Sequence, residues 1–188
     1  RGVPGTHDTI LLNQCMKNFK KKKFKKTLIP RFDKSIDDRL KKKNWQKIDK
    51  KPEIVIFEGW CVGAKPQKKK DLLKPVNALE KNKDKKKIWR NTVNEELKKN
   101  YKKIFKLIDF SIFLEVPSFK HVFKWRLLQE KKLKKVSKGK KTMNRAQIKN
   151  FIMYYERLTK HMIKNFKKEA NCVIQIDKKH KLKSIKLN

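Results

Sequence analysis

The segment Ile54-Val55-Ile56-Phe57-Glu58-Gly59-Trp60 indicates the class of fold more strongly than any other part of the sequence. A run of four apolar residues, rich in β-branched side chains, ends at an acid and a glycine. Such a run is typical of a strand buried on both faces, as in a parallel sheet flanked by helices. Ligands bind outside the carboxyl ends of strands in open α/β sheets, so Glu58 could orient water around a magnesium ion or accept a proton. The alternative is that Glu58 only caps the next turn.

The length and the cysteine content limit the class of protein. A chain of 188 residues is long enough for one α/β domain with a core, and we expect residues 1–188 to form a single domain. No apolar run approaches the roughly 20 residues that cross a bilayer, and the first residues do not resemble a signal peptide. Three cysteines, far apart and odd in number, suit a reducing compartment. We therefore expect a cytoplasmic protein without a membrane segment.

The formal net charge of +37 raises the possibility of a nucleic-acid-binding protein. However, the 55 basic residues comprise 7 arginines and 48 lysines, which are spread along almost the whole chain. Base readout and bidentate phosphate contacts favour arginine. The charge therefore favours weak, non-specific binding to polyanions at low salt over a specific nucleic-acid partner.

Strand-like and helix-like segments alternate along the chain, which predicts an α/β fold with a largely parallel sheet. Residues 31–39 form a polar segment that could line a site or be an ordinary charged loop. We interpret 40–51 as a connection, 72–79 as irregular, and 134–141 as a basic loop. We expect strands at 27–29, 54–57, 108–116 and 173–176, with 182–187 as a hairpin edge. We expect helices at 8–20 and 142–168, a third that begins at Trp89 and a fourth that begins at Pro117.

Six stretches, in the same order, resemble D-glycerate 3-kinase and related ATP-dependent kinases of the P-loop superfamily. The resemblance covers nearly the whole chain, and six motifs in register are fairly specific although each is weak alone. The motifs are Arg1-Gly2-Val3-Pro4-Gly5-Thr6-His7-Asp8, Pro30-Arg31-Phe32-Asp33-Lys34-Ser35, Ile56-Phe57-Glu58-Gly59-Trp60, Val93-Asn94-Glu95-Glu96-Leu97, Trp125-Arg126-Leu127-Leu128-Gln129-Glu130 and Tyr154-Tyr155-Glu156-Arg157-Leu158-Thr159.

The resemblance implies a P-loop NTPase-like three-layer domain that transfers a phosphoryl group from ATP to a hydroxyl of a small acceptor, with magnesium and cationic side chains neutralising charge. Glu58 matches an acid that acts on magnesium through water, and Arg126 matches a lid arginine that reaches the ATP phosphates. Arg157 and His161 are interpreted as structural. The residues that the resemblance assigns to the acceptor side are Arg1, His7, Asp8, Arg31, Asp33 and Lys34. His7 could bind the acceptor or only order its loop.

Because Arg31 can hold both oxygens of a carboxylate, we expect an acceptor such as D-glycerate or a similar hydroxy acid. The chain departs from the family in one respect: the Walker A loop and the paired acids that precede the first motif do not occur. The Gly139-Lys140-Lys141-Thr142 stretch is no substitute, since it lacks the first glycine and a buried strand before it.

The chain is therefore the C-terminal part of a kinase or a degenerate relative, and the intact acceptor motifs favour the former. We expect residues 1–188 alone to have no kinase activity. The competing hypotheses are a basic nucleic-acid-binding protein and a non-catalytic scaffold with the kinase fold.

Overall fold

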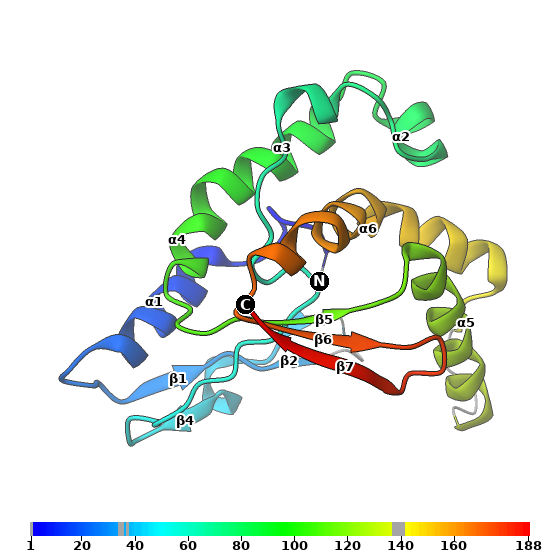
Figure 1. Cartoon of the computed structure of the whole chain (residues 1–188). Helices are drawn as coiled ribbons and strands as arrows, with labels where there is room; N and C mark the ends of the chain where they lie inside the picture. Colours follow the sequence, from blue (N-terminus) through cyan, green and yellow to red (C-terminus); the bar gives the residue numbers. More distant parts are fainter. Residues whose placement is uncertain (1, 34–35, 37, 137–141) are drawn as a thin grey trace.

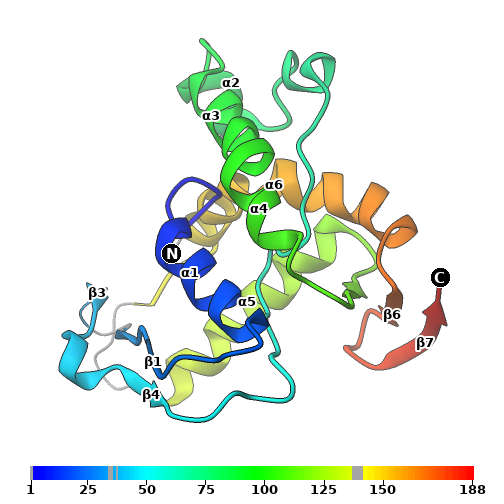
Figure 2. The same cartoon turned by 90° about the vertical axis from the view of Figure 1, so that its left-hand side faces the viewer.

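A computed structural model describes residues 2–33, 36, 38–136 and 142–188. The first helix, α1 (Thr9–Lys20), follows the predicted range 8–20 and buries Cys15 and Met16. Asp8 caps it, since its carboxylate accepts a hydrogen bond of 3.0 Å from the Leu11 amide. α1 lies beside α4 (Lys102–Phe105), a helix far from it in the sequence (Figure 2).

Two short antiparallel hairpins follow α1. The predicted strand 27–29 is confirmed as β1 (Thr27–Ile29), which pairs with β4 (Gln46–Ile48) in the segment expected to be a connection. Between them, β2 (Phe32–Asp33) pairs with β3 (Asp38–Arg39). The short helical turn η1 (Lys42–Asn44) precedes β4, and the intervening indole of Trp45 donates to the Leu40 carbonyl at 2.7 Å. The polar segment 31–39 is thus a small hairpin rather than a simple loop.

The prediction of a buried central strand at 54–57 is wrong for this structure. The segment belongs to none of the strand pairs in the described ranges. Ile54 and Ile56 are 80% and 87% exposed. A strand is held by hydrogen bonds to a neighbouring strand, and apolar side chains alone do not supply that neighbour. The four residues therefore leave a patch of apolar surface next to Glu58.

The middle of the chain is helical. A short turn, η2 (Lys69–Leu72), and α2 (Ala78–Lys83) precede α3 (Ile88–Glu96), which forms the first part of the helix predicted from Trp89. The range 72–79, expected to be irregular, ends in the first residues of α2, which Asn77 caps. α3 continues through a π-helical turn, η3 (Leu97–Tyr101), into α4. In Figure 1, α2 and α3 are drawn at the top and α4 lies lower, at the left.

The remaining strands form a three-stranded sheet. β5 (Ile112–Glu115) pairs in parallel with β6 (Cys172–Ile176), which pairs in antiparallel with β7 (Leu182–Leu187). The strands predicted at 173–176 and 182–187 are confirmed, and the one predicted at 108–116 is shorter than expected. Only the β5–β6 pair is parallel among the four pairs of the described part, so the prediction of a largely parallel sheet is wrong.

Two long helices connect β5 to β6. α5 (Phe119–Val136) extends into the range 134–141 that was expected to be a basic loop, and residues 137–141 lie outside the described part. α6 (Arg145–Asn165) begins at a capping box formed by Asn144 and Gln147, and a last turn, η4 (Phe166–Lys168), completes the predicted helix 142–168. α6 lies over one face of the three-stranded sheet (Figure 1).

The core lies between the middle helices and α6. Its buried residues are Cys61, Ala64, Leu97, Tyr101, Leu158 and Met162. Phe166 packs edge-on against Phe113 of β5, with ring centroids 5.4 Å apart. The other face of the sheet is apolar and exposed at Ile112, Leu114, Ile185 and Leu187. The fold is therefore mixed α/β, as predicted, with small sheets and one sheet face uncovered in the described structure.

No helix in the described ranges is long and apolar enough to cross a membrane.

Candidate functional site

The loop of residues 2–8, called the 2–8 loop below, connects most of the predicted site. Val3 and Pro4 are buried, and the Val3 carbonyl accepts hydrogen bonds from the amide and the hydroxyl of Thr6 at 3.1 and 2.8 Å. Gly5 has a φ of 101°, a region that residues with a Cβ rarely adopt. Hydrogen bonds within the loop and a glycine at the position of positive φ therefore stabilise the turn.

Tyr101 joins this loop to the π-helical turn. Its buried hydroxyl lies 2.5 Å from His7 Nδ1 and accepts a hydrogen bond of 3.3 Å from the Gly5 amide. Burial raises the pKa of Tyr101 to about 12 and lowers the pKa of His7 below its usual value. A neutral phenol therefore faces a neutral imidazole at neutral pH.

Asp8 connects the 2–8 loop to the β2–β3 hairpin. Its second carboxylate oxygen forms an ion pair of 2.8 Å with Arg39 Nη1. The Leu11 amide, followed by the Arg39 guanidinium, lowers the pKa of Asp8. In the same hairpin, Asp33 is half-buried and the exposed Arg31 accepts a hydrogen bond from the Leu40 amide through its carbonyl. Two other predicted residues, Arg1 and Lys34, lie outside the described residues.

The segment that carries Glu58 lies against the other end of the loop. The indole of Trp60 donates to the Gly2 carbonyl at 3.2 Å and packs edge-on against Tyr155 of α6, with ring centroids 4.9 Å apart. Glu58 itself is exposed, and its carboxylate has no hydrogen bond or ion pair with a described residue. It is therefore accessible to a ligand. The described residues include no group of three or more potential metal ligands, so Glu58 is not part of a preformed direct metal site.

A row of aromatic rings links this region to Arg126 on α5. The Arg126 guanidinium lies 5.6 Å from the centroid of the Phe151 ring, which lies 5.0 Å from that of Tyr155. Arg126 Nη1 donates to Gln129 at 2.6 Å. Its Nη2 is 3.2 Å from the buried Glu130 carboxylate, an ion pair without the geometry of a hydrogen bond, and its Nε has no partner. Arg126 is thus only partly engaged by its neighbours.

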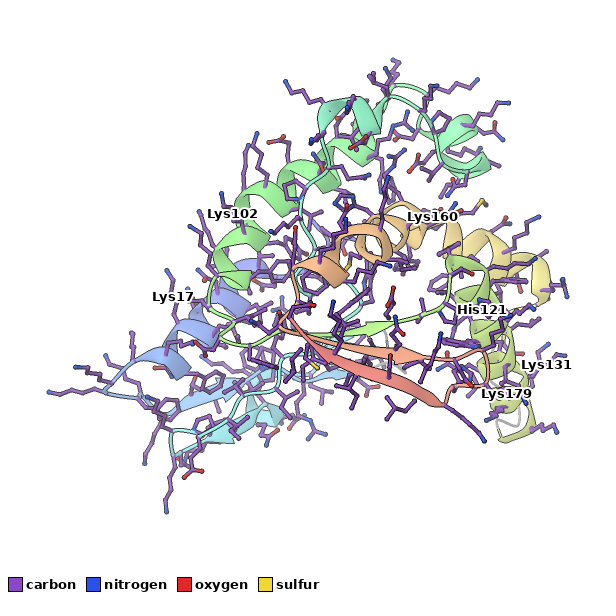
Figure 3. The ribbon with its side chains drawn as sticks, viewed as in Figure 1. Lys17, Lys102, His121, Lys131, Lys160 and Lys179 are labelled. Carbon is purple, nitrogen blue, oxygen red and sulfur yellow. The ribbon has the colours of Figure 1, made fainter. Side chains whose placement is uncertain are left out.

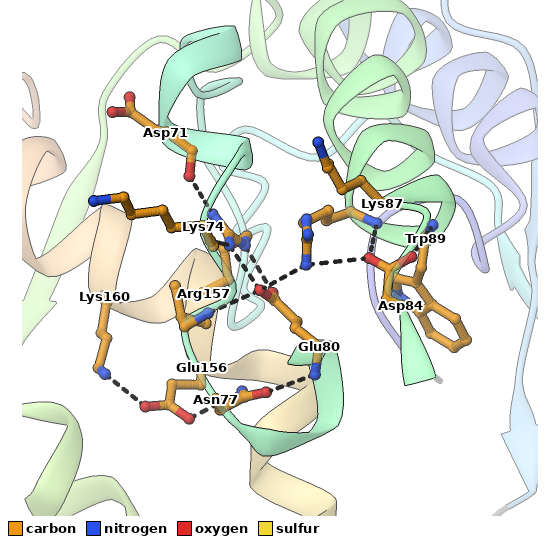
Figure 4. A network of polar contacts seen from close by, with 12 residues as sticks. Asp71, Lys74, Asn77, Glu80, Asp84, Lys87, Trp89, Glu156, Arg157 and Lys160 are labelled. Carbon is orange, nitrogen blue, oxygen red and sulfur yellow. Dashed lines mark hydrogen bonds and ion pairs between the residues drawn. The ribbon is translucent and has the colours of Figure 1, made fainter. Parts of the chain in front are cut away.

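A buried polar network, which the sequence did not predict, fixes α2 and α3 to α6 (Figure 4). Arg157 donates two hydrogen bonds of 2.7 Å to Glu80 and one each, also of 2.7 Å, to the carbonyls of Asp71 and Lys74. Arg90, which is 4% exposed, pairs with the same Glu80 at 3.3 Å. Burial acts to raise the pKa of Glu80, but the hydrogen bonds and charges of these arginines hold it below its usual value. Arg157 therefore has a structural position.

Asn77 completes the network at the start of α2. Its side chain accepts from the Glu80 amide at 3.0 Å and donates to the Met153 carbonyl at 2.9 Å and to Glu156 at 3.0 Å. On α3, Asn94 exchanges two hydrogen bonds with the backbone of Gln67. The position of Asn77 beside a turn in the sequence could have indicated that it caps a helix. Its other partners lie on the distant helix α6, so the sequence did not indicate the network.

A pocket of about 580 Å³ separates the 2–8 loop from the α2–α3 turn. Its wall is apolar where Trp89 and Val93 meet Val3 and Pro4. Cationic side chains of the turn also line it, namely Lys83, Lys85 and Lys86. The predicted residues Arg31, Asp33, Glu58 and Arg126 do not line this pocket, so the structure gathers the predicted motifs around the 2–8 loop but not within one cavity.

No family model matches the chain. Two curated kinases are similar to it over 162 residues, or 82% of the chain. The "Uncharacterized kinase mug58" of Schizosaccharomyces pombe is 34% identical, and the chain covers 56% of its length. The chloroplastic D-glycerate 3-kinase of Arabidopsis thaliana is 27% identical, and the chain covers 32% of it. The chain thus spans about half and one third of these two relatives.

Solved structures show the same fold. D-glycerate 3-kinase from Cryptococcus neoformans var. grubii superposes on the whole chain with a TM-score of 0.76 and 23% identity, and the chain covers 69% of it. The YGR205w protein superposes on 99% of the chain with a TM-score of 0.73 and 25% identity, and 66% of it is covered. These similarities confirm the resemblance that the six motifs predicted.

Proposed function

We propose that this chain, a relative of the D-glycerate 3-kinases, forms the acceptor-binding and lid part of a kinase that transfers a phosphoryl group from ATP to a hydroxyl of a small hydroxy acid. The observation that carries the proposal is the set of contacts around the 2–8 loop. The Asp8–Arg39 ion pair connects the loop to the β2–β3 hairpin, whose strand β2 belongs to the second motif. The Trp60–Gly2 hydrogen bond connects the loop to the third motif, and the aromatic row connects it to the last two. Motifs far apart in the sequence thus surround one loop, as residues of a shared site do.

On this proposal the acceptor carboxylate binds Arg31 and Lys34, Asp33 holds a hydroxyl group of the acceptor, and His7 lies on the adjoining loop within the same site. Arg31 suits the first role because a guanidinium can bind both oxygens of a carboxylate. Support comes from the Asp8–Arg39 ion pair, which ties the hairpin of Arg31 and Asp33 to the loop that carries His7. The 580 Å³ pocket is a separate cavity, since Arg31, Asp33 and His7 do not line it.

Glu58 and Arg126 would act on the nucleotide side. The accessible carboxylate of Glu58 can hold a magnesium ion through water, and the described residues offer it no hydrogen bond or ion pair that would compete with that role. Magnesium, when bound, neutralises charge on the phosphates. Arg126 would move from Gln129 and Glu130 to the phosphates, which its partial engagement allows.

The proposed function includes a P-loop-type three-layer architecture for the complete kinase. The exposed apolar residues of β5 and β7 and of the segment 54–57 support it, because a further layer would remove that surface from water. Ile54, Ile56, Ile112 and Leu114 are the residues that such a layer would cover first.

The lysines do not suggest a specific nucleic-acid site. Figure 3 shows side chains such as Lys17, Lys102, Lys131, Lys160 and Lys179 projecting from different elements rather than from one face. We therefore propose that any binding to nucleic acid is independent of sequence and weakens as salt rises.

The test uses the full-length protein, because the chain covers only 56% of mug58. We expect ATP consumption with glycerate or another small hydroxy acid, a large loss of kcat in Glu58→Gln, and a raised KM for the acceptor in Arg31→Ala. Lys86→Ala, in the apolar pocket, is the matched control and should leave both constants unchanged. Nucleosides used tenfold better than every acid, or Arg31→Ala with an unchanged KM, would contradict the proposal.

A further inference from the structure

Tyr101 and His7 form a buried contact that the proposed function does not by itself require. Tyr101 is 3% exposed, and its hydroxyl is shared between His7 Nδ1 and the Gly5 amide. The two partners come from the 2–8 loop, more than ninety positions away in the sequence. The contact therefore couples the conformation of this loop to the helix that follows α3.

The hydrogen-bonding capacity of the phenol fixes the direction of these bonds. The Gly5 N–H can only donate, so it uses a lone pair of the Tyr101 oxygen. The buried phenol proton needs an acceptor, and His7 Nδ1 is the acceptor that the described residues provide. His7 Nδ1 therefore carries no proton, and in the neutral ring the proton is on Nε2.

The position of Tyr101 depends on an unusual backbone. Tyr101 is the last residue of the π-helical turn η3, which interrupts an otherwise α-helical run between α3 and α4. Such a turn changes the direction in which the following side chains point, and π-helical turns occur frequently at functional sites. The contact and the turn are independent observations, and both concern the same side chain.

We propose that Tyr101 is a positioning residue that holds His7 in the Nε2–H tautomer, so that this N–H donates a hydrogen bond to an anionic oxygen of the substrates. His7 Nε2 has no described protein acceptor, so its proton is available. The inference rests on the proposed function and adds a residue to it. The imidazole donates a hydrogen bond and keeps its proton throughout.

Two substitutions of His7 separate this role from a purely structural one. The amide nitrogen of Gln can replace the Nε2–H donor, whereas the amide oxygen of Asn can replace Nδ1 as the acceptor for Tyr101. In the full-length protein we expect His7→Gln to keep kcat within about tenfold of the wild-type value. His7→Asn should lower kcat by roughly a hundredfold, because loss of one hydrogen-bond donor to a developing anion has an effect of this size. If His7→Asn raises only the KM for the acceptor, the anionic oxygen that accepts the hydrogen bond belongs to the acceptor carboxylate.

Tyr101→Phe removes the phenol oxygen and should lower kcat more than tenfold, while NMR of the imidazole nitrogens should show a mixture of tautomers in place of Nε2–H alone. His121→Asn is the matched control, because the His121 imidazole on α5 forms a hydrogen bond with Ser118, which precedes that helix. Its kcat should equal that of the wild type. A His7→Asn enzyme as active as the wild type, combined with an inactive His7→Gln enzyme, would overturn the proposal, and so would an Nδ1–H tautomer in the wild type. The NMR measurement needs no activity, so failure of the kinase proposal is distinguishable from failure of this one.

Discussion

Replacing Glu80 by Gln tests how far the buried polar network holds the middle helices in place. Glu80 accepts two hydrogen bonds from Arg157, one from the Val76 amide and one from Arg90. Gln has nearly the same shape but only one acceptor oxygen. In either orientation its NH2 group would face a donor: Arg157 Nε at the Oε1 position, or the donors of Arg157, Val76 and Arg90 at the Oε2 position. Arg157 would lose its counter-charge, and Arg90 would keep only the Asp84 carboxylate, 3.6 Å away.

The magnitude follows from the burial of these groups. The side chains of Arg90, Arg157 and Glu80 are 4, 10 and 12% exposed, so water cannot replace the lost carboxylate. Breaking a buried pair from one side typically costs about 3–5 kcal/mol. With an urea m-value of about 2 kcal/mol per molar, the unfolding midpoint should fall by roughly 2 M.

Urea unfolding of the full-length protein, followed by circular dichroism, measures this shift. Glu95→Gln is the matched control, since Glu95 forms only exposed ion pairs of 3.9 Å with Lys98 and Lys99 and should cost less than about 1 kcal/mol. A Glu80→Gln protein within 1 kcal/mol of the wild type would refute the reasoning.

The Glu80 carboxylate should also make the stability difference between wild type and Glu80→Gln depend on pH in the acid range. The folded pKa of Glu80 lies below its usual value of 4.5, so the folded state binds fewer protons than the unfolded state. The stabilisation is therefore fully present above pH 4.5 and is lost as the pH falls through the folded pKa. The stability difference between wild type and Glu80→Gln should shrink below pH 4.5, and a constant difference down to the acid transition would exclude Glu80 as its source.

Two further predictions concern local geometry. Gly63 has a φ of 79°, and a Cβ there would lie 2.3 Å from Cζ of Phe166, so Gly63→Ala should destabilise the protein by about 2–4 kcal/mol in the same unfolding assay. Gly59→Ala, where the nearest atom is 3.1 Å away on Val62, is its control, and equal costs would contradict the explanation. Asp8→Asn should keep the cap of α1 and lose little, whereas Asp8→Ala should lose about 1 kcal/mol; equal losses would assign the effect to the Arg39 ion pair instead.

The elements that the sequence predicts well are those whose ends are set locally. Asp8 and Asn144 are side chains that cap helices in their own neighbourhood, and α1 and α6 begin next to them. The strands β1 and β7 have the predicted bounds because Pro30 ends the first and a turn precedes the second. Local chemistry was sufficient at these positions, because the partner of each deciding side chain lies within a few residues.

The strand predicted at 54–57 shows the limit of local reasoning. Its composition is that of a buried strand, yet Ile54 and Ile56 are exposed because pairing depends on a neighbour that composition cannot specify. The strand β4 was missed for the same reason, namely that pairing depends on a neighbour. The connection 40–51 lacks the pattern of a strand, but Gln46–Ile48 lies beside β1 and pairs with it in antiparallel.

The candidate site is harder to predict than the fold because the contacts that join its motifs are long-range. Motif order placed His7, Glu58 and Arg126 in one family pattern, but it gave no indication of Tyr101, whose role depends on a contact 94 positions away in the sequence and on a π-helical turn. A tyrosine at helical spacing is most simply a core residue, and Tyr101 is indeed in the core. What distinguishes it is the direction of one hydroxyl group, which connects the core to the 2–8 loop. In this protein, the residue that orders the loop is therefore recognised from its hydrogen-bond partners rather than from its place in a motif.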